Sequence, residues 1–299
     1  MRVSRIHSLW ALCALGALPL AAAASENTVD RTVNAHPTGD VLISNVSGSV
    51  DVRGWDRNEV QVKGQLDEDV ERVDVDTSGG RTTIKVILPR NSHNGGDAML
   101  EIQVPRGSVL EVSAVSADIT SRGVLGTQRL KTVSGEITAE ISGDDSEVRS
   151  VSGDLSVKGN GKPGSLRVSS VSGSLELTDS AGKLDVVTVS GDARVQMGDT
   201  SEVNARTTSG TLELRARLLR DARVSVEGVS GDINLDLGDA AGLALEIESF
   251  SGDITGCLAG DAERVSKYGP GVRLNTRTGD GSARVRAKTL SGDIDICNR

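Results

Sequence analysis

The chain has 299 residues and a formal net charge of −9, with 42 acidic residues against 33 basic ones. This acidic balance argues against nucleic acid or anionic lipid as the main partner, because both would be repelled. Aromatic residues make up only 1% of the chain, so a core for a protein of this length must be built from Val, Leu, Ile and Ala.

Residues 1–24 have the pattern of a secretory signal peptide. Arg2 and Arg5 precede an apolar run, and small residues lead up to a predicted cleavage site after Ala24. The run is short for a bilayer span, which disfavours the alternative of a retained membrane anchor. Without the two arginines, 31 basic residues face 42 acids, so the mature chain 25–299 carries about −11. We expect an extracytoplasmic protein with no transmembrane segment after signal cleavage: periplasmic first, or else secreted or at the cell surface.

A short phrase, of which "TVSGEI" and "SVSGDL" are examples, recurs along the mature chain. Its serine marks the copies at Ser47, Ser116, Ser134, Ser152, Ser172, Ser190, Ser209, Ser230, Ser251 and Ser291. From Ser116 to Ser251 the copies are 18 to 21 residues apart. Apolar residues recur six, four and one before the serine and three and five after it; around Ser172 these are Leu166, Val168, Val171, Leu175 and Leu177.

This pattern predicts two short strands, each with one buried face, joined by a corner at the serine. Gly follows the serine in all copies but one, where Ala117 replaces it, and an acid often comes next, as expected of a turn. The variable segments between corners, such as "EISGDD", "TDSAGK", "MGDTSE" and "RARLLRDAR", are expected to be loops. We predict an all-β, single-stranded β-solenoid of about ten short coils, each stacked about 4.8 Å from the next. A β-sandwich is the main alternative.

Two stretches interrupt the repeat. Residues 54–112 alternate strongly but lack the phrase, which predicts an irregular β cap at the N-terminal end. Residues 113–256 should form the regular coils, and 257–299 an excursion followed by a closing strand. The whole of 25–299 is expected to be a single elongated domain.

The signal peptide, the early "GDVLISNVSGSVDVRGWDRNEVQVKG", the repeated "VSGDI" or "VSGDL" and the closing "TGDGSARVRAKTLSGDIDIC" together resemble a bacterial family of unknown function. Its members are described as β-strand-repeat proteins and putative adhesins. The resemblance covers about residues 29–297. It implies a right-handed β-helix-like fold and an envelope location, and it offers no catalytic residues to carry over.

Cys257 and Cys297 each lie six residues after a phrase serine, so they should occupy the same corner of their coils. If their coils are adjacent, the backbones are about 4.8 Å apart, a spacing that suits a disulfide; with one coil between them they are too distant. An oxidising compartment and two mature cysteines favour the bridge. We therefore predict a structural disulfide and a single excursion over 257–290, with unpaired buried thiols as the alternative.

The acids that follow the corner form a column if the coils stack. Its members are Asp118, Glu136, Asp154, Asp192, Asp232, Asp253 and Asp293, with Ser174 and Thr211 as gaps. We interpret them as turn-forming residues in solvent. A ladder of divalent cations is the alternative, because hard cations prefer clustered oxygen ligands. No cofactor or metal is expected.

Arg215, Arg217, Arg220 and Arg223 form a basic cluster within the acidic chain. A solvated loop face is the simpler interpretation, and an anion-binding patch for an envelope component is the alternative. A polysaccharide-active enzyme would need two acids at a defined separation, and no pair stands out. Only Trp55 and Tyr268 could offer sugars a surface aromatic platform. We expect a non-enzymatic scaffold or adhesin-like protein of the cell envelope that binds an envelope protein or glycan.

Overall fold

The computed structural model describes residues 27–90, 96–238, 242–258, 262–266 and 270–297. Every regular element in these ranges is a β-strand, which confirms the all-β prediction. The predicted signal peptide and Tyr268 lie outside the described residues. A search of the described residues found no helix with the length and hydropathy needed to cross a membrane.

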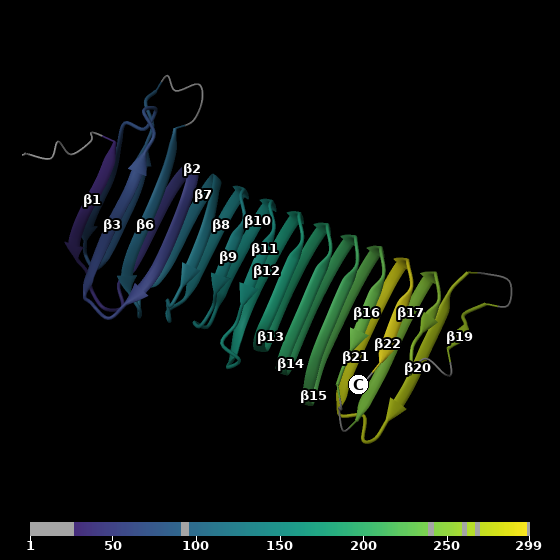
Figure 1. Cartoon of the computed structure of the whole chain (residues 1–299). Helices are drawn as coiled ribbons and strands as arrows, with labels where there is room; N and C mark the ends of the chain where they lie inside the picture. Colours follow the sequence, from purple (N-terminus) through teal and green to yellow (C-terminus); the bar gives the residue numbers. More distant parts are fainter. Residues whose placement is uncertain (1–26, 91–95, 239–241, 259–261, 267–269, 298–299) are drawn as a thin grey trace, which may run out of the picture.

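The middle of the molecule is a stack of parallel strands in which chain order equals spatial order (Figure 1). From Ser134 to Ser230, each phrase serine lies in register with the serine of the next copy. The strands of this part are β7 (Val109–Arg122), β8 (Gln128–Ser134), β9 (Ile137–Glu140), β10 (Ser146–Ser152), β11 (Leu155–Lys158), β12 (Pro163–Ser172), β13 (Leu175–Ser190), β14 (Ala193–Ser209), β15 (Leu212–Ser230) and β16 (Ile233–Asp236).

Several connections that were predicted to be loops are strand. "EISGDD" does interrupt the strands, but "TDSAGK", "MGDTSE" and "RARLLRDAR" lie inside β13, β14 and β15. These segments pair with their neighbours, which satisfies backbone groups that a loop would leave to water. The extra length of β15 is absorbed by a bulge between Leu218 and Arg223, where Asp221 has a φ of 63°.

The N-terminal end is closed by strands that run antiparallel to one another. β2 pairs in parallel with β7 on one side and with β5 and β6 on the other, so the segment between β2 and β7 lies outside β2 in the stack. β1 pairs antiparallel with β3, β3 with β6, and β4 with β5. The strands are β1 (Thr28–Asn34), β2 (Asp40–Trp55), β3 (Glu59–Leu66), β4 (Arg72–Ser78), β5 (Arg81–Ile87) and β6 (Asp97–Pro105).

At the C-terminal end the last coil is inserted between two earlier ones. β21 pairs in parallel with both β15 and β17, and β22 with both β16 and β18. β20 and β19 then cover β17 in antiparallel pairs, at the far end of Figure 1. The spatial order of the last serines is therefore Ser230, Ser291, Ser251, which chain order does not indicate. The strands are β17 (Leu243–Ser251), β18 (Ile254–Thr255), β19 (Glu263–Arg264), β20 (Val272–Thr278), β21 (Ala283–Ser291) and β22 (Ile294–Cys297).

The core consists of aliphatic columns that run along the stack. Residues four before and three and five after each phrase serine point inward; in β12 and β13 these are Val168, Leu175 and Leu177, all at most 1% exposed. The residue two before the serine also points inward and is small and polar, as at Ser150, Ser170 and Thr188. Stacked parallel strands with no room for large rings explain why this core uses so few aromatic residues.

The prediction that the valine directly before the serine fills the core is wrong. Val171 is 43% exposed, and the equivalent residues of the copies from Ser116 onward are exposed as well, whereas Val46 in the first copy is half-buried. Because side chains alternate along a strand, an inward residue two before the serine places the next residue outside. The phase shifts at the serine, because the residue before it and the serine itself are both exposed, and the phrase turns an apolar side chain toward solvent.

Candidate functional site: the corner ridge

The repeated corners of the stack form a continuous ridge, which we call the corner ridge. From Ser116 onward it consists of the residue before each phrase serine, the serine itself, the following glycine or Ala117, and the residue after that. The side chains before the serine, which we call the ridge column, are Val115, Val133, Val151, Val171, Val189, Thr208, Val229, Leu290 and Phe250 in spatial order. Their apolar members are 40–55% exposed, with Leu290 and Phe250 the most open at 55%.

Glycine is required at the ridge because neighbouring coils approach there closely. Gly191 has a φ of 135°, and a Cβ added to it would lie 2.2 Å from the carbonyl oxygen of Gly173 in the adjacent coil. A side chain would therefore meet both backbone strain and a steric clash. The close approach keeps the ridge straight and brings successive ridge side chains to the spacing of the coils.

The aspartates of the predicted acid column tie one coil to the next. Asp154 Oδ1 accepts the backbone N–H of Ser174 at 2.7 Å, and Asp192 Oδ1 accepts that of Thr211 at 2.8 Å. The same bond joins Asp118 to Glu136, Asp232 to Asp293, and Asp293 to Asp253. Each of these five carboxylates thus satisfies a corner N–H of the neighbouring coil, a charge-assisted bond between coils rather than within one turn.

The acid column carries charge that the described chain leaves unpaired. None of its seven members forms an ion pair among the ones described, whereas acids elsewhere on the stack commonly do. A search of the described residues found no group of three or more His, Cys, Asp or Glu side chains placed to hold a metal ion. The ridge therefore presents an apolar line, a hydroxyl line and a line of negative charge side by side.

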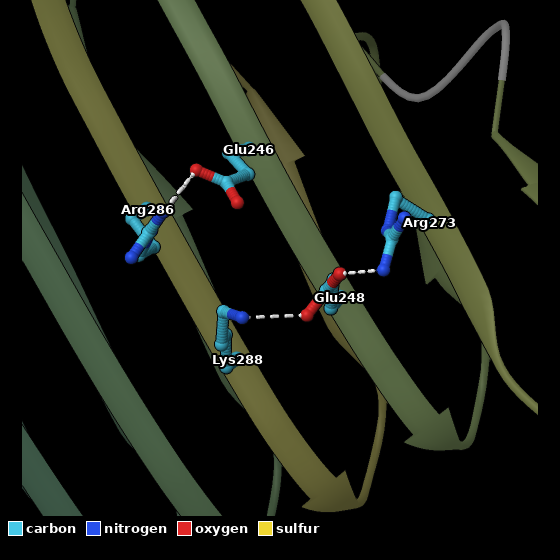
Figure 2. A network of polar contacts seen from close by, with 5 residues as sticks. All are labelled: Glu246, Glu248, Arg273, Arg286 and Lys288. Atoms are coloured by element: carbon cyan, nitrogen blue, oxygen red, sulfur yellow. Dashed lines mark hydrogen bonds and ion pairs between the residues drawn. The ribbon is translucent and has the colours of Figure 1, made fainter.

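An ion-pair network on the outer face explains why β21 lies between β15 and β17. Arg286 and Lys288 on β21 contact Glu246 and Glu248 on β17 at 2.5 and 2.7 Å, and Arg273 on β20 contacts Glu248 from the other side (Figure 2). The hydrogen bond from Lys288 is the largest cause that lowers the pKa of Glu248, and Arg273 adds to it. The hydrogen bond to Glu246 in turn raises the pKa of Arg286.

On its other side, β21 again places a basic side chain opposite an acidic one, on β15. Lys288 is in register with Glu227 of β15 as well as with Glu248 of β17. If the coils followed chain order, Glu227 and Glu248 would face each other across adjacent strands, where like charges are destabilising. Inserting the basic strand removes that repulsion.

The four arginines singled out in the sequence do not form one uncompensated patch. Arg217 contacts Asp199 at 2.5 Å, and the hydrogen bond with Asp199 is the largest cause that raises the pKa of Arg217. Arg215 lies 3.6 Å from Asp236, and Arg220 lies 3.5 Å from Asp280. Arg223 is in register with Glu202 on one neighbouring strand and with Arg284 on the other. Most of their positive charge is balanced by acids on neighbouring segments.

The two cysteines lie at equivalent places in adjacent coils, Cys297 at the end of β22 and Cys257 in the turn that follows β18. The backbone N–H of Cys257 points to Sγ of Cys297 at 3.0 Å, and the side chains are not joined by a disulfide in this structure. A hydrogen bond with Cys257 is the largest cause that raises the pKa of the Cys297 thiol. The placement gives the adjacent-coil geometry that the disulfide prediction requires, and the bond itself stays a prediction.

The hollows on the surface are charged and lie between strands. One, of about 360 Å³, is lined by residues that include Arg167, Lys183, Asp185 and Glu202, which are already joined as Arg167–Asp185 and Lys183–Glu202 ion pairs. Trp55 donates from Nε1 to the carbonyl of Glu59 at 2.8 Å and has Arg57 5.0 Å above its ring, so it is not an open platform for a sugar.

A family profile described as Toastrack DUF4097 matches residues 49–297, which is most of the chain. The chain belongs to the Toastrack DUF4097 family. This confirms the resemblance seen in the sequence. The family has no established function, so the match identifies the kind of protein without assigning an activity to the ridge.

Several solved bacterial structures are similar to this Toastrack chain. A "putative adhesin" from Parabacteroides distasonis has 10% identity and a TM-score of 0.41, with 90% of this chain and 97% of that chain covered. A "putative adhesin" from Bacteroides fragilis has 12% identity and a TM-score of 0.39, covering 91% and 97%. A "putative lipid binding protein" from P. distasonis has 12% identity and a TM-score of 0.37, covering 91% and 98%. No curated protein matches the chain. Scores at this level carry no argument about function.

Proposed function

We propose that this protein is a non-enzymatic, extracytoplasmic interaction protein, a scaffold or adhesin-like component of the cell envelope that makes contact through the corner ridge. The observation that carries the proposal is the ridge column: eight apolar side chains and one threonine, turned to solvent at every coil from Val115 to Phe250. A monomeric surface seldom keeps a long apolar line open without using it.

We infer that the architecture is a right-handed β-solenoid. In-register parallel pairing from coil to coil and the inward aliphatic columns support it. Each coil repeats the corner, so a contact made at one coil can be repeated along the ridge. Recognition would be distributed over many weak and similar contacts rather than concentrated in one pocket.

An enzyme of the same architecture is the alternative, and product analysis distinguishes it. The exported protein is incubated with purified envelope and extracellular glycans, with and without calcium. The proposal predicts no new reducing ends and no unsaturated products, and no rise in melting temperature with calcium. New products would overturn the non-enzymatic assignment, and a calcium-dependent rise would instead favour a cation-binding surface protein.

Thiol titration of the exported protein, unfolded without reductant, tests the compartment and the bridge together. Loss of two hydrogens from the adjacent thiols to the oxidants of an extracytoplasmic compartment would join Cys257 and Cys297. We expect no reactive thiol. Two would refute the bridge, and one would mean that Cys13, and with it the signal sequence, is retained.

A further inference from the structure

The ridge column is long enough to serve as a complete interface. It crosses nine successive coils, and eight steps of about 4.8 Å give a length of about 38 Å. To reach about 800 Å², the area that each partner contributes to a standard stable interface, a strip of that length must be about 20 Å wide and so must include the polar residues on both sides of the ridge column. The patch is therefore large enough for a protein partner, and its apolar centre has polar borders, as such interfaces do.

The spacing of the column selects the kind of partner. An α-helix presents side chains on one face about every 5.4 Å, and an extended strand about every 6.6 Å, so neither stays in register with a 4.8 Å ladder for long. Over eight steps a helix falls behind by about 5 Å, a full coil. A second stack with the same rise matches at every step, and another copy of this chain is certain to have it.

We propose that the corner ridge is a homodimer interface in which two copies lie parallel, related by a twofold axis along the stack, with ridge column against ridge column. This rests on the proposed function and names the occupant of the same surface. Each valine meets its own equivalent in the partner, so the contact is isologous and closed.

Charge decides between the two possible directions. An antiparallel pair would bring the acid column of one copy against the acid column of the other, which places lines of like charge face to face. A parallel pair instead brings the acid column of one copy against a different line of the other copy. That line consists of the outward-facing residues three positions before each phrase serine. That line carries the exposed cations Lys131, Arg149, Arg206 and Lys288.

The cations of that line already have acid partners inside each copy: Lys131 and Arg149 share Glu147, and the other two pair with the two acids of the line itself. Glu227 pairs with Arg206 at 3.1 Å, and Glu248 with Lys288 at 2.7 Å. The acid column has no such partners among the described residues, so its negative charge is not compensated within one copy. Parallel pairing thus sets an unpaired negative line beside a line that holds four cations and two acids, and this excess of cations favours it over the antiparallel arrangement.

Sedimentation equilibrium of the exported chain tests the interface. The variant combines V133T, V151T, V171T and V189T, which keep β-branching and shape but replace four apolar contacts by hydroxyls. Thr208 shows that the column accepts threonine in the native fold. We expect the wild type to dimerise and the variant to lose at least tenfold in affinity, with an unchanged melting temperature at protein concentrations where both are monomers. The reverse substitution, Thr208→Val, should tighten the dimer several-fold.

Cross-linking tests the direction. In a C257S/C297S background, single cysteines replace Ser134, Ser172 or Ser230. In a parallel dimer each forms a disulfide with its own equivalent; in an antiparallel dimer only the one nearest the twofold axis does so. Uniform cross-linking supports the proposal. A monomer at all concentrations, or cross-linking at a single position only, overturns it. A monomer that nevertheless binds envelope material through the ridge would leave the proposed function standing.

Discussion

Val168 and Val171 lie three residues apart on β12, yet the first is fully buried and the second is 43% exposed. The same contrast holds in other copies, as between Val186 and Val189. Both columns are aliphatic and repeat with the coil, so composition does not distinguish them. The inner column packs the core, and the outer column packs only against its own repeats unless something else covers it. One residue type therefore builds the core on one side of the strand and lies open to solvent on the other, where we propose that it makes contact.

The difference in stability cost between the buried column and the ridge column should be largest when a leucine is truncated to alanine. Leu175→Ala removes a side chain that is 1% exposed and should lower the free energy of unfolding by about 2–5 kcal/mol through lost burial and a cavity. Leu290→Ala, on the ridge, should cost less than about 1 kcal/mol in dilute protein. Urea denaturation of both variants measures the difference, and equal losses would contradict the assignment of the two sides.

A matched pair of threonine substitutions sharpens the comparison within one strand. Val168→Thr buries a hydroxyl with no ready partner and should cost about 1–3 kcal/mol. Val171→Thr leaves its hydroxyl in water and should change stability by less than about 0.5 kcal/mol. Thermal unfolding at low protein concentration checks both. If Val171→Thr proved the more damaging, the ridge column would belong to the core.

Removing a carboxylate of the acid column should have a cost in stability between those of the buried and the exposed substitutions. Asp192→Ala leaves the N–H of Thr211 without its charge-assisted acceptor and should cost about 1 kcal/mol. Asp192→Asn keeps an acceptor oxygen at the same place and should recover most of the loss. Equilibrium unfolding of the two variants tests whether the carboxylate bridges the coils. If it were only a solvated charge, both variants would be as stable as the wild type.

The smallest effect is the pH dependence from the network around Glu248. Its pKa is lowered from an ordinary value of 4.5 by Lys288 and Arg273, so its stabilisation is present above pH 4.5 and is lost as the pH falls through the lowered pKa. For a surface pair this is about 0.5–1 kcal/mol. Glu248→Gln should therefore be less stable than the wild type at pH 7 and nearly equal to it at pH 3. A gap that stays constant down to pH 3 would assign the loss to packing.

Much of this fold could be predicted from the repeated phrase. The all-β character, the stacking of corners in one column and the need for glycine all follow from a fixed pattern around each serine. The position of the acids beside the corner also followed from their spacing, although their bond to the neighbouring coil needed the register of the stack. The strands, the corner and the glycine can be predicted from the sequence of a single coil, because every coil repeats them.

The rest depends on contacts between coils. The outward turn of Val171 was missed because an apolar residue was assumed to face inward, although the small polar residue before it, Ser170, was the signal for the true phase. The insertion of β21 depends on Glu227 and Glu248 repelling each other at a distance of one coil, which chain order does not show. The length of β13 to β15 was missed because Gly, Asp and Ser are also tolerated in strands that are paired on both sides.

Oxidative footprinting is the most direct test of the central claim, that the ridge column is surface in the monomer and interface in the assembly. Hydroxyl radicals modify side chains that contact water. At low protein concentration, Phe250, Leu290 and the ridge valines should be modified, while Val168 and Leu175 should not. At high concentration the ridge residues alone should become protected. Protection that does not change with concentration, or a ridge that is already unreactive in the monomer, would contradict this account.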